Sequence, residues 1–181
     1  MTTALILFAA GSEELEAITV VNILRRAGVS VTLAGLTAGA LRGSRGVMVM
    51  PDTTLDEALM RGSYDMVVLP GGQPGTNHLK ADARVLRLLQ HMAQQDKYVA
   101  AICAAPSVLA TAGLLDGRKA TCFPGSLADF PKVDLQTTAI VEDGKLITSR
   151  GPGTAMDFAL LLAERLTGKA QRQEVEAGLQ R

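Results

Sequence analysis

The chain has 181 residues, of which 48% are hydrophobic, and it carries 18 acidic and 18 basic side chains. This length is enough for one well-buried core and short for two, so we expect a single domain over residues 1–181 with its core at about 3–170. The charges form no basic block, and aromatic residues make up only 3% of the chain with no tryptophan, which argues against nucleic acid as a partner.

The first elements predict a βαβ unit. Residues 4–10 form a continuous apolar run, which is typical of a strand covered on both faces. Ser12 is expected to cap the following helix, which has an acidic first turn and should end at Gly28. The side chains expected to face the core are Leu15, Ile18, Val21 and Leu24. Residues 29–35 predict the second strand, so the two strands should lie parallel.

The middle of the chain continues this alternation. Residues 36–50 contain a glycine-flanked turn between short strand-like pieces and predict a hairpin or an edge segment, and residues 51–60 predict a short helix. Residues 64–69 predict another buried strand, and residues 81–95 have apolar positions at helical spacing. This order favours a sheet with helices packed against it.

The C-terminal part adds a hairpin and two helices. Asp143-Gly144, between two strand-like runs, is the strongest short hairpin signal in the chain. Thr154 should cap a long amphipathic helix, with Asp157 in a capping-box-like position, and residues 171–181 predict a short terminal helix. The whole pattern predicts one α/β domain with helices on both faces of a mainly parallel sheet.

One cysteine occupies a position typical of a nucleophile. Residues 98–102 predict a strand, Cys103 follows at once, and residues 105–112 predict a helix. Such a junction is a nucleophile elbow, which presents a side chain at the carboxyl edge of a sheet. A helix N-terminus favours an anion, so we expect a lowered pKa for the Cys103 thiol. A buried, inert cysteine is the alternative.

The cysteine and histidine content limits the metal sites and the compartment. Cys103 and Cys122 lack CxxC spacing, and His78 and His91 are the only histidines, so we expect no metal site. This cysteine usage suits a reducing cytoplasm. The first ten residues lack a basic n-region, and no apolar stretch reaches the length of a membrane span. We therefore expect neither a signal peptide nor a membrane anchor.

Three segments should meet at the carboxyl edge of the sheet: residues 11–16, Gly71-Gly72 and Cys103. The glycine pair would let backbone N–H groups bind an oxyanion, although a tight turn explains the same pair. A protonated glutamate of segment 11–16 could donate to the cysteine sulfur and pass a proton to a substrate oxygen. The helix dipole also favours acidic residues there, and spacing does not choose among the three glutamates.

Weaker signals surround this edge. The loop 151–154 could cradle an anion at a helix start, but it lacks the spacing of a P-loop or a dinucleotide-binding loop. Arg45 and Arg150 could hold an anionic group, although surface arginines are usually solvated. A cysteine nucleophile normally needs a base. His78 follows the glycine turn and should lie near this edge, whereas His91 is expected within a helix.

Five stretches carry a resemblance to a known family. They are residues 11–16 (GSEELE), 25–28 (RRAG), 67–72 (VVLPGG), 100–106 (AAICAAP) and 148–154 (TSRGPGT). Together they resemble the DJ-one/ThiJ/PfpI superfamily, and within it the branch of YajL-type proteins and protein deglycases. The resemblance implies a flavodoxin-like (Rossmann-like) three-layer α/β sandwich with a mainly parallel sheet, a nucleophile elbow and a small hairpin. It also implies a homodimer.

The same resemblance implies roles for individual residues. Cys103 would be the nucleophile, Glu16 the glutamate that meets its sulfur, and the backbone N–H groups of Gly72 and Ala104 the oxyanion donors. Glu13 and Arg45 match residues around the pocket or across the dimer interface. The further residues expected around the pocket are Gly71, His78, Phe123 and Pro152.

Two departures from the family pattern narrow the expected chemistry. Cys103 is followed by Ala104-Ala105 and not by the histidine of the protease-like branch, so peptidase activity is not expected. Phe123 stands where the human-type pocket has a histidine, so Cys103 and Glu16 would have to carry out the catalysis without that histidine.

The resemblance implies a cofactor-independent enzyme for reactive dicarbonyls such as methylglyoxal and glyoxal, or for their adducts with amines and thiols. Its chemistry would be that of a glyoxalase or a deglycase, in the response to carbonyl and oxidative stress. The alternative is a non-catalytic oxidative-stress sensor or redox-regulated chaperone that acts through oxidation of Cys103.

Overall fold

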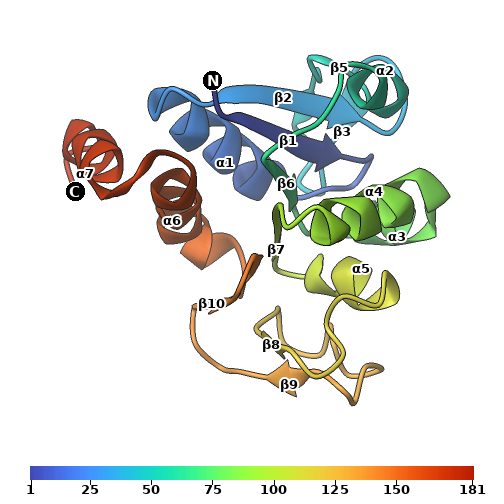
Figure 1. Cartoon of the computed structure of the whole chain (residues 1–181). Coiled ribbons are helices and arrows are strands. Elements are labelled where there is room, and N and C mark those ends of the chain that lie inside the picture. The colour runs from blue at the N-terminus through green and yellow to red at the C-terminus, as the bar shows by residue number, and fades with distance from the viewer.

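The computed structural model describes all residues, 1–181, and is organised around a seven-stranded sheet (Figure 1). The strand order is β10-β11-β7-β6-β1-β2-β5, and only β10 runs antiparallel to its neighbour. The strands of this sheet are β1 (Thr3–Phe8), β2 (Ser30–Gly35), β5 (Thr53–Thr54), β6 (Met66–Leu69), β7 (Tyr98–Ile102), β10 (Ile140–Asp143) and β11 (Leu146–Ser149). The predicted α/β class and mainly parallel sheet are confirmed.

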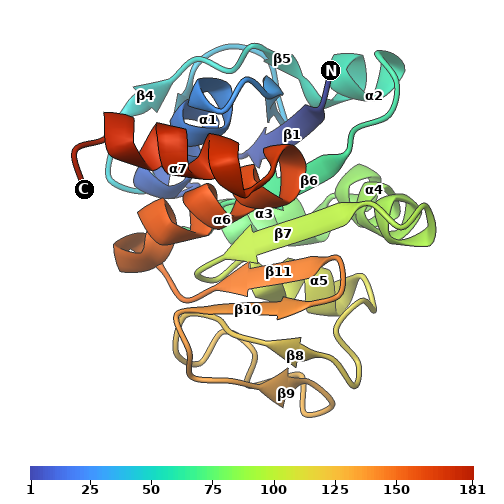
Figure 2. The same ribbon diagram turned by 60° about the vertical axis from the view of Figure 1, so that its left-hand side comes forward.

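Two short strand pairs lie outside the main sheet. The predicted hairpin of residues 36–50 is formed by β3 (Leu41–Arg42) and β4 (Met48–Val49), which pair antiparallel. The strands β8 (Lys119–Ala120) and β9 (Asp134–Leu135) pair parallel and extend the molecule beyond β10 (Figure 2). The Asp143-Gly144 turn joins β10 to β11, as its sequence predicts.

Seven α-helices cover the sheet. They are α1 (Glu14–Arg26), α2 (Leu55–Met60), α3 (Gly75–Ala81), α4 (Ala83–Gln94), α5 (Pro106–Thr111), α6 (Ala155–Thr167) and α7 (Lys169–Gly178). A 3-10 turn, η1 (Pro152–Thr154), precedes α6. The sequence does not predict α3, which forms a separate short helix directly before α4. None of the helices combines the length and apolar character that a bilayer crossing requires.

The helices form two layers, one on each side of the sheet. Helices α1, α6 and α7 lie on one side, and α3, α4 and α5 lie on the other (Figure 1). Alternate residues of β1 supply both cores: Ile6 belongs to the cluster with α1 and α6, whereas Leu5 and Leu7 belong to the cluster with α2–α5. Burial on both faces explains why the first strand is apolar without interruption.

Helix α1 buries a different face from the one predicted. Val21 and Leu24 are buried as expected, but Leu15 is 50% exposed and Ile18 is 43% exposed. The face against the core is instead formed by Ala17, Val20, Ile23 and Leu24. The predicted stripe was wrong for its first two positions because this helix carries apolar residues around much more than one face.

The two residues predicted to cap helices, Ser12 and Thr154, make other hydrogen bonds with their side chains. The residue at the N-cap position of α1 is Glu13, and Ser12 Oγ accepts a hydrogen bond from the N–H of Ala9 at 3.1 Å. Thr154 precedes α6 but makes no capping bond, because its hydroxyl contacts Ser149 Oγ at 2.6 Å and the carbonyl of Gly151. The expected capping box is therefore absent.

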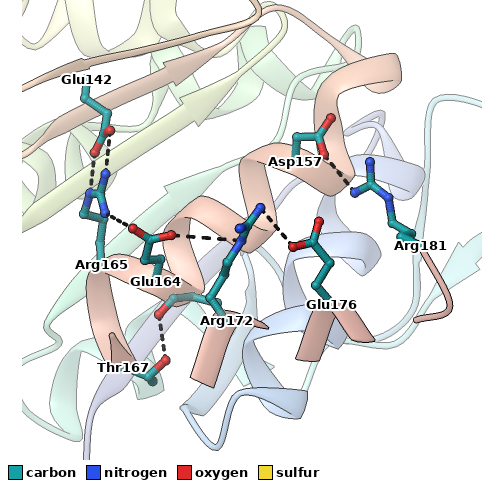
Figure 3. Close-up of polar contacts among 9 residues, drawn as sticks. Glu142, Asp157, Glu164, Arg165, Thr167, Arg172, Glu176 and Arg181 are labelled. Carbon is teal, nitrogen blue, oxygen red and sulfur yellow. Dashed lines mark hydrogen bonds and ion pairs between the residues drawn. The ribbon is translucent and has the colours of Figure 1, made fainter. Parts of the chain in front are cut away.

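The C-terminal helix is tied to the rest of the molecule by a network of ion pairs (Figure 3). Arg165 on α6 binds Glu142 on β10 through two contacts of 2.6 and 2.8 Å and also contacts Glu164 at 2.9 Å. On α7, Arg172 reaches Glu164 at 4.0 Å and Glu176 at 3.1 Å. Each carboxylate in this network has a guanidinium partner.

Candidate active site

Cys103 lies at the carboxyl end of β7 in a conformation that few non-glycine residues adopt. Its φ is +65°, in the left-handed region, which is unfavourable for a side chain with a Cβ. The backbone is held on both sides: the N–H of Cys103 donates to Ser149 at 2.9 Å, and its carbonyl accepts from the N–H of Phe123 at 2.7 Å. Strain of this kind persists only where the surroundings enforce it and is frequent at active sites. The elbow predicted from the sequence is confirmed.

Glu16 in the first turn of α1 is buried beside this thiol. Its side chain has no solvent exposure, and its Oε2 accepts a hydrogen bond from the N–H of Gly71 at 2.7 Å. The carboxyl group also interacts with the Cys103 thiol, whereas Oε1 is buried without a hydrogen-bond partner. A buried acceptor without a donor favours the protonated carboxyl group.

The two acidic groups shift each other's titration. Burial raises the pKa of Glu16 to about 7, against the hydrogen bond from Gly71. Burial and the neighbouring Glu16 carboxylate raise the pKa of Cys103 to about 12. The expectation of a lowered thiol pKa was therefore wrong, because Cys103 is only 8% exposed and faces an acidic side chain. Between these two values the pair holds one proton. A thiolate then exists when that proton lies on Glu16.

Two backbone N–H groups face the thiol sulfur. The N–H groups of Gly72 and Ala104 hydrogen-bond to Cys103 and act to lower its pKa. The backbone can come this close to the sulfur because residues 71 and 72 are glycines, and neither position has room for a side chain. A Cβ on Gly71 would lie 2.6 Å from Cys103 Cβ, and Gly72 has a φ of +85° with the backbone of Glu13 against it. Two N–H groups converging on one point can hold a developing oxyanion.

The thiol opens into a cavity of about 360 Å³ at the carboxyl edge of the sheet. Its lining residues are Glu13, Ser44, Arg45, Gly72, Gln73, Cys103, Ala104, Phe123 and Pro152. The expected pocket residues Glu13, Arg45, Phe123 and Pro152 thus lie around the thiol. Gly71 and Glu16 lie behind the cavity wall, in contact with Cys103.

Other candidates from the sequence lie elsewhere. His78 on α3 is not among the residues that line the cavity, and its Nδ1 contacts the carbonyl oxygen of Ala10 at 2.9 Å. Arg150 points to the carbonyl of Thr137 at 3.0 Å. Cys122 is buried in the core cluster of α2–α5, whereas Cys103 belongs to the opposite cluster.

Sequence reasoning missed two side chains of the cavity, and it included Glu14 among the candidate glutamates without its contact to the loop. Ser44 and Gln73 line the cavity, and Ser44 Oγ donates to Glu13 Oε2 at 2.6 Å. Glu14 lies under the loop that carries Ser44 and Arg45. The turn at residues 43–46 was visible in the sequence, but nothing in it indicated that the turn folds back onto α1.

Comparisons with known proteins give the family of the chain. The family model described as DJ-1/PfpI matches residues 2–165. Protein dj-1beta of Drosophila melanogaster is 45% identical over 182 residues, which cover 98% of this chain and 96% of that protein. Glutathione-independent glyoxalase DJR-1.2 of Caenorhabditis elegans is 31% identical over 160 residues, 87% of this chain and 84% of that protein.

Solved structures agree with this assignment. The crystal structure of Drosophila melanogaster DJ-1beta has a TM-score of 0.93 to this chain, with 44% identity and coverage of 98% of this chain and 97% of the other. Oxidized DJ-1 from Toxoplasma gondii also has a TM-score of 0.93, with 37% identity and 99% and 98% coverage. The matched structures share the flavodoxin-like fold of this sheet and its helices. The chain belongs to the DJ-1/PfpI family.

Proposed function

We propose that this protein is a cofactor-independent enzyme that converts reactive dicarbonyls such as methylglyoxal and glyoxal into 2-hydroxy acids. The observation that carries the proposal is the buried pair of Cys103 and Glu16, with two N–H groups directed at the same sulfur. The likeness to a relative described as a glutathione-independent glyoxalase supports it. The adducts of these dicarbonyls with amines and thiols are the alternative substrates, and an enzyme that acts on them would be a deglycase.

The first step forms a carbon–sulfur bond. A proton moves from the Cys103 thiol to the Glu16 carboxylate, and the thiolate adds to the aldehyde carbon. The carbonyl oxygen becomes an oxyanion that the N–H groups of Gly72 and Ala104 stabilise. Glu16 then returns its proton to this oxygen, which gives a neutral hemithioacetal.

The second step is an internal redox exchange followed by hydrolysis. Glu16 removes the proton from the former aldehyde carbon and delivers a proton to the adjacent carbonyl carbon, while the hydroxyl proton of the hemithioacetal passes to the oxygen of that carbonyl. The first carbon is thereby oxidised to a thioester and the second is reduced to an alcohol, so no external electron carrier is needed. Water cleaves the thioester, which releases the 2-hydroxy acid and restores the thiol. A carboxyl group with a pKa of about 7 is suited to moving protons in both directions at neutral pH.

One observation favours a second candidate, an oxidation sensor. The N–H groups that face the sulfur would also hold the oxygens of a sulfenic or sulfinic acid on Cys103. Both cysteines are free thiols, and we propose the reducing cytoplasm as the compartment in which such a sensor or enzyme works.

Replacement of Cys103 by serine tests the enzymatic proposal. We expect Cys103→Ser to abolish methylglyoxal consumption and lactate formation, while the matched variant Cys122→Ser keeps both. Product formation by the purified proteins can be followed by NMR. Unchanged consumption by Cys103→Ser would rule out the proposed reaction. Oxidation of Cys103 by mild peroxide in a wild-type protein that forms no lactate would favour the sensor.

We also propose that the protein forms a homodimer through an exposed apolar surface. This surface comprises Leu15 and Ile18 of α1 with Val47, Met48 and Met50 of the β3–β4 hairpin, all exposed, beside a groove of about 730 Å³. Contiguous exposed apolar side chains of this kind mark interaction sites. We expect Ile18→Glu to halve the molecular mass measured by light scattering. A wild-type monomer would contradict this assignment.

A further inference from the structure

The tip of the β3–β4 hairpin is attached to the segment that starts α1. The backbone N–H of Ser44 donates to the carbonyl of Ser12 at 2.8 Å, and the N–H of Gly11 donates to the carbonyl of Arg42 at 2.8 Å. Residues 43–47 therefore lie across the first turn of α1, where Glu14 and Glu16 are located.

Glu14 binds the backbone of this tip. Both carboxylate oxygens of Glu14 accept from the N–H of Arg45 at 3.1 Å, and Oε1 also accepts from the N–H of Val47 at 3.2 Å. Gly43 lies so close to the carboxylate that a Cβ at this position would overlap it. The side chain is buried, and it is the acceptor for the backbone N–H groups of Arg45 and Val47.

The same tip delivers two side chains to the cavity. Ser44 Oγ donates to Glu13 Oε2 at 2.6 Å, and Arg45 Nε lies 3.5 Å from the same oxygen. The Arg45 side chain is 80% exposed, so little packing holds it. Its place at the cavity mouth therefore depends on the contact with Glu13 and on the position of the Arg45 backbone. Glu13, Ser44 and Arg45 form a polar wall of the cavity, whereas Glu16 lies behind the cavity lining and contacts Cys103.

We propose that Glu14 is a positioning residue that holds Ser44 and Arg45 on this polar wall and thereby sets the affinity for the carbonyl substrate, without taking part in the chemistry at Cys103. This proposal rests on the proposed function, because it requires a dicarbonyl substrate. The thiol attacks one carbonyl group, and the polar wall binds the oxygen of the other. Of the three neighbouring glutamates, Glu16 serves the thiol, Glu13 lines the cavity and Glu14 fixes the loop.

The ionisation of Glu14 fits this role. Although burial acts to raise it, the pKa of Glu14 is lowered by the backbone N–H groups that donate to it. Glu16, two residues away, has the opposite shift. The loop is therefore held by a carboxylate that is charged at neutral pH, and hydrogen bonds to a charged acceptor are the stronger kind.

The variant Glu14→Gln tests the proposal because it keeps the size of the side chain. The amide oxygen can still accept from Arg45 and Val47, as Glu14 Oε1 does, but the NH₂ group that replaces Oε2 cannot accept from Arg45, and the acceptor is no longer charged. The readout is the concentration of methylglyoxal that halves the rate of iodoacetamide labelling at Cys103, which needs no turnover. We expect Glu14→Gln to raise this concentration by roughly five- to twentyfold, with the labelling rate in the absence of methylglyoxal unchanged within about twofold. In steady-state assays we expect the change in KM and not in kcat.

A matched control and a second variant complete the design. Glu57→Gln removes another first-turn carboxylate that accepts a backbone N–H, that of Thr54 at 3.2 Å, far from the cavity wall, and should leave both readouts unchanged. Ser44→Ala removes only the hydroxyl and should weaken protection in the same direction. In the double variant of Ser44 and Glu14 the two losses should add only in part, because Glu14 acts partly through the position of the Ser44 hydroxyl and partly through Arg45.

The outcomes separate this inference from the proposed function. Wild-type protein that methylglyoxal does not protect overturns the proposed function, and this inference with it. Protection of wild type that is unchanged in Glu14→Gln overturns only the role of Glu14. A Glu14→Gln variant whose Cys103 labels severalfold more slowly without methylglyoxal would show that Glu14 supports the thiol itself, which also contradicts the proposal.

Discussion

The cavity at Cys103 and the C-terminal ion-pair network use buried or half-buried carboxylates in opposite ways. In the network, Glu142 and Glu164 each face a guanidinium group, and these contacts raise the pKa of Arg165. Behind the cavity wall, Glu16 is fully buried with no cationic partner, and its pKa rises to about 7. The comparison shows that carboxylates with guanidinium partners join elements of the fold, whereas Glu16, which is buried without a cation and with one oxygen unpartnered, becomes a proton donor and acceptor near neutral pH.

The largest effect is expected where this unpaired carboxyl group is replaced. Glu16→Gln keeps a group that can accept from Gly71 and donate to the thiol, but it cannot exchange a proton. We expect kcat for methylglyoxal to fall by about 10²- to 10⁴-fold, the usual range for loss of general acid–base catalysis. Lactate production by the purified variant measures it, and a kcat equal to that of wild type would remove Glu16 from the mechanism.

The same substitution should change the pH dependence of stability. The pKa of Glu16 is raised on folding from 4.5 to about 7, so the folded state favours the protonated form, and this stabilisation is present below pH 4.5 and lost as the pH rises through 7. The shift corresponds to about 3 kcal/mol. We expect Glu16→Gln to unfold at higher denaturant concentration than wild type at pH 8, with the gain vanishing near pH 4. Equal gains at both pH values would contradict the raised pKa.

The smallest effect is expected in the ion-pair network. Arg165 and Glu142 are each about one third exposed, so solvent screens their contact. We expect Arg165→Ala to lower the free energy of unfolding by about 1 kcal/mol or less, and less still at high salt, with no change in the labelling of Cys103. Urea titrations at low and high salt test this. A change in Cys103 reactivity would show that the two regions are coupled.

The main elements of the fold could be predicted because their signals are local. The apolar runs of β1, β6 and β7 and the Asp143-Gly144 turn are each contained in a few consecutive residues. The exposed face of α1 could not be predicted from Leu15 and Ile18, because exposed apolar residues on a helix can have the same spacing as those in a core. Burial depends on what the remaining chain covers.

The candidate site could be predicted only in part, for a similar reason. Cys103 at a strand end and Gly71-Gly72 after another strand point to the same sheet edge, and family resemblance selected Glu16. The contact of Glu14 with Arg45 joins residues 31 positions apart and follows from the path of the hairpin. The raised pKa of the thiol also depends on neighbours that only the folded chain brings together.

The shared proton of Cys103 and Glu16 is tested most directly by the pH dependence of iodoacetamide labelling at Cys103. In the wild-type protein we expect reactivity to rise with a midpoint near pH 7, when the pair loses its first proton and a thiolate beside a protonated Glu16 becomes populated. In Glu16→Gln this step should disappear, leaving a single thiol titration below the value of about 12 that burial and Glu16 together impose. Identical profiles in the two proteins, with one midpoint at the ordinary thiol pKa of about 8.5, would contradict the sharing of a proton.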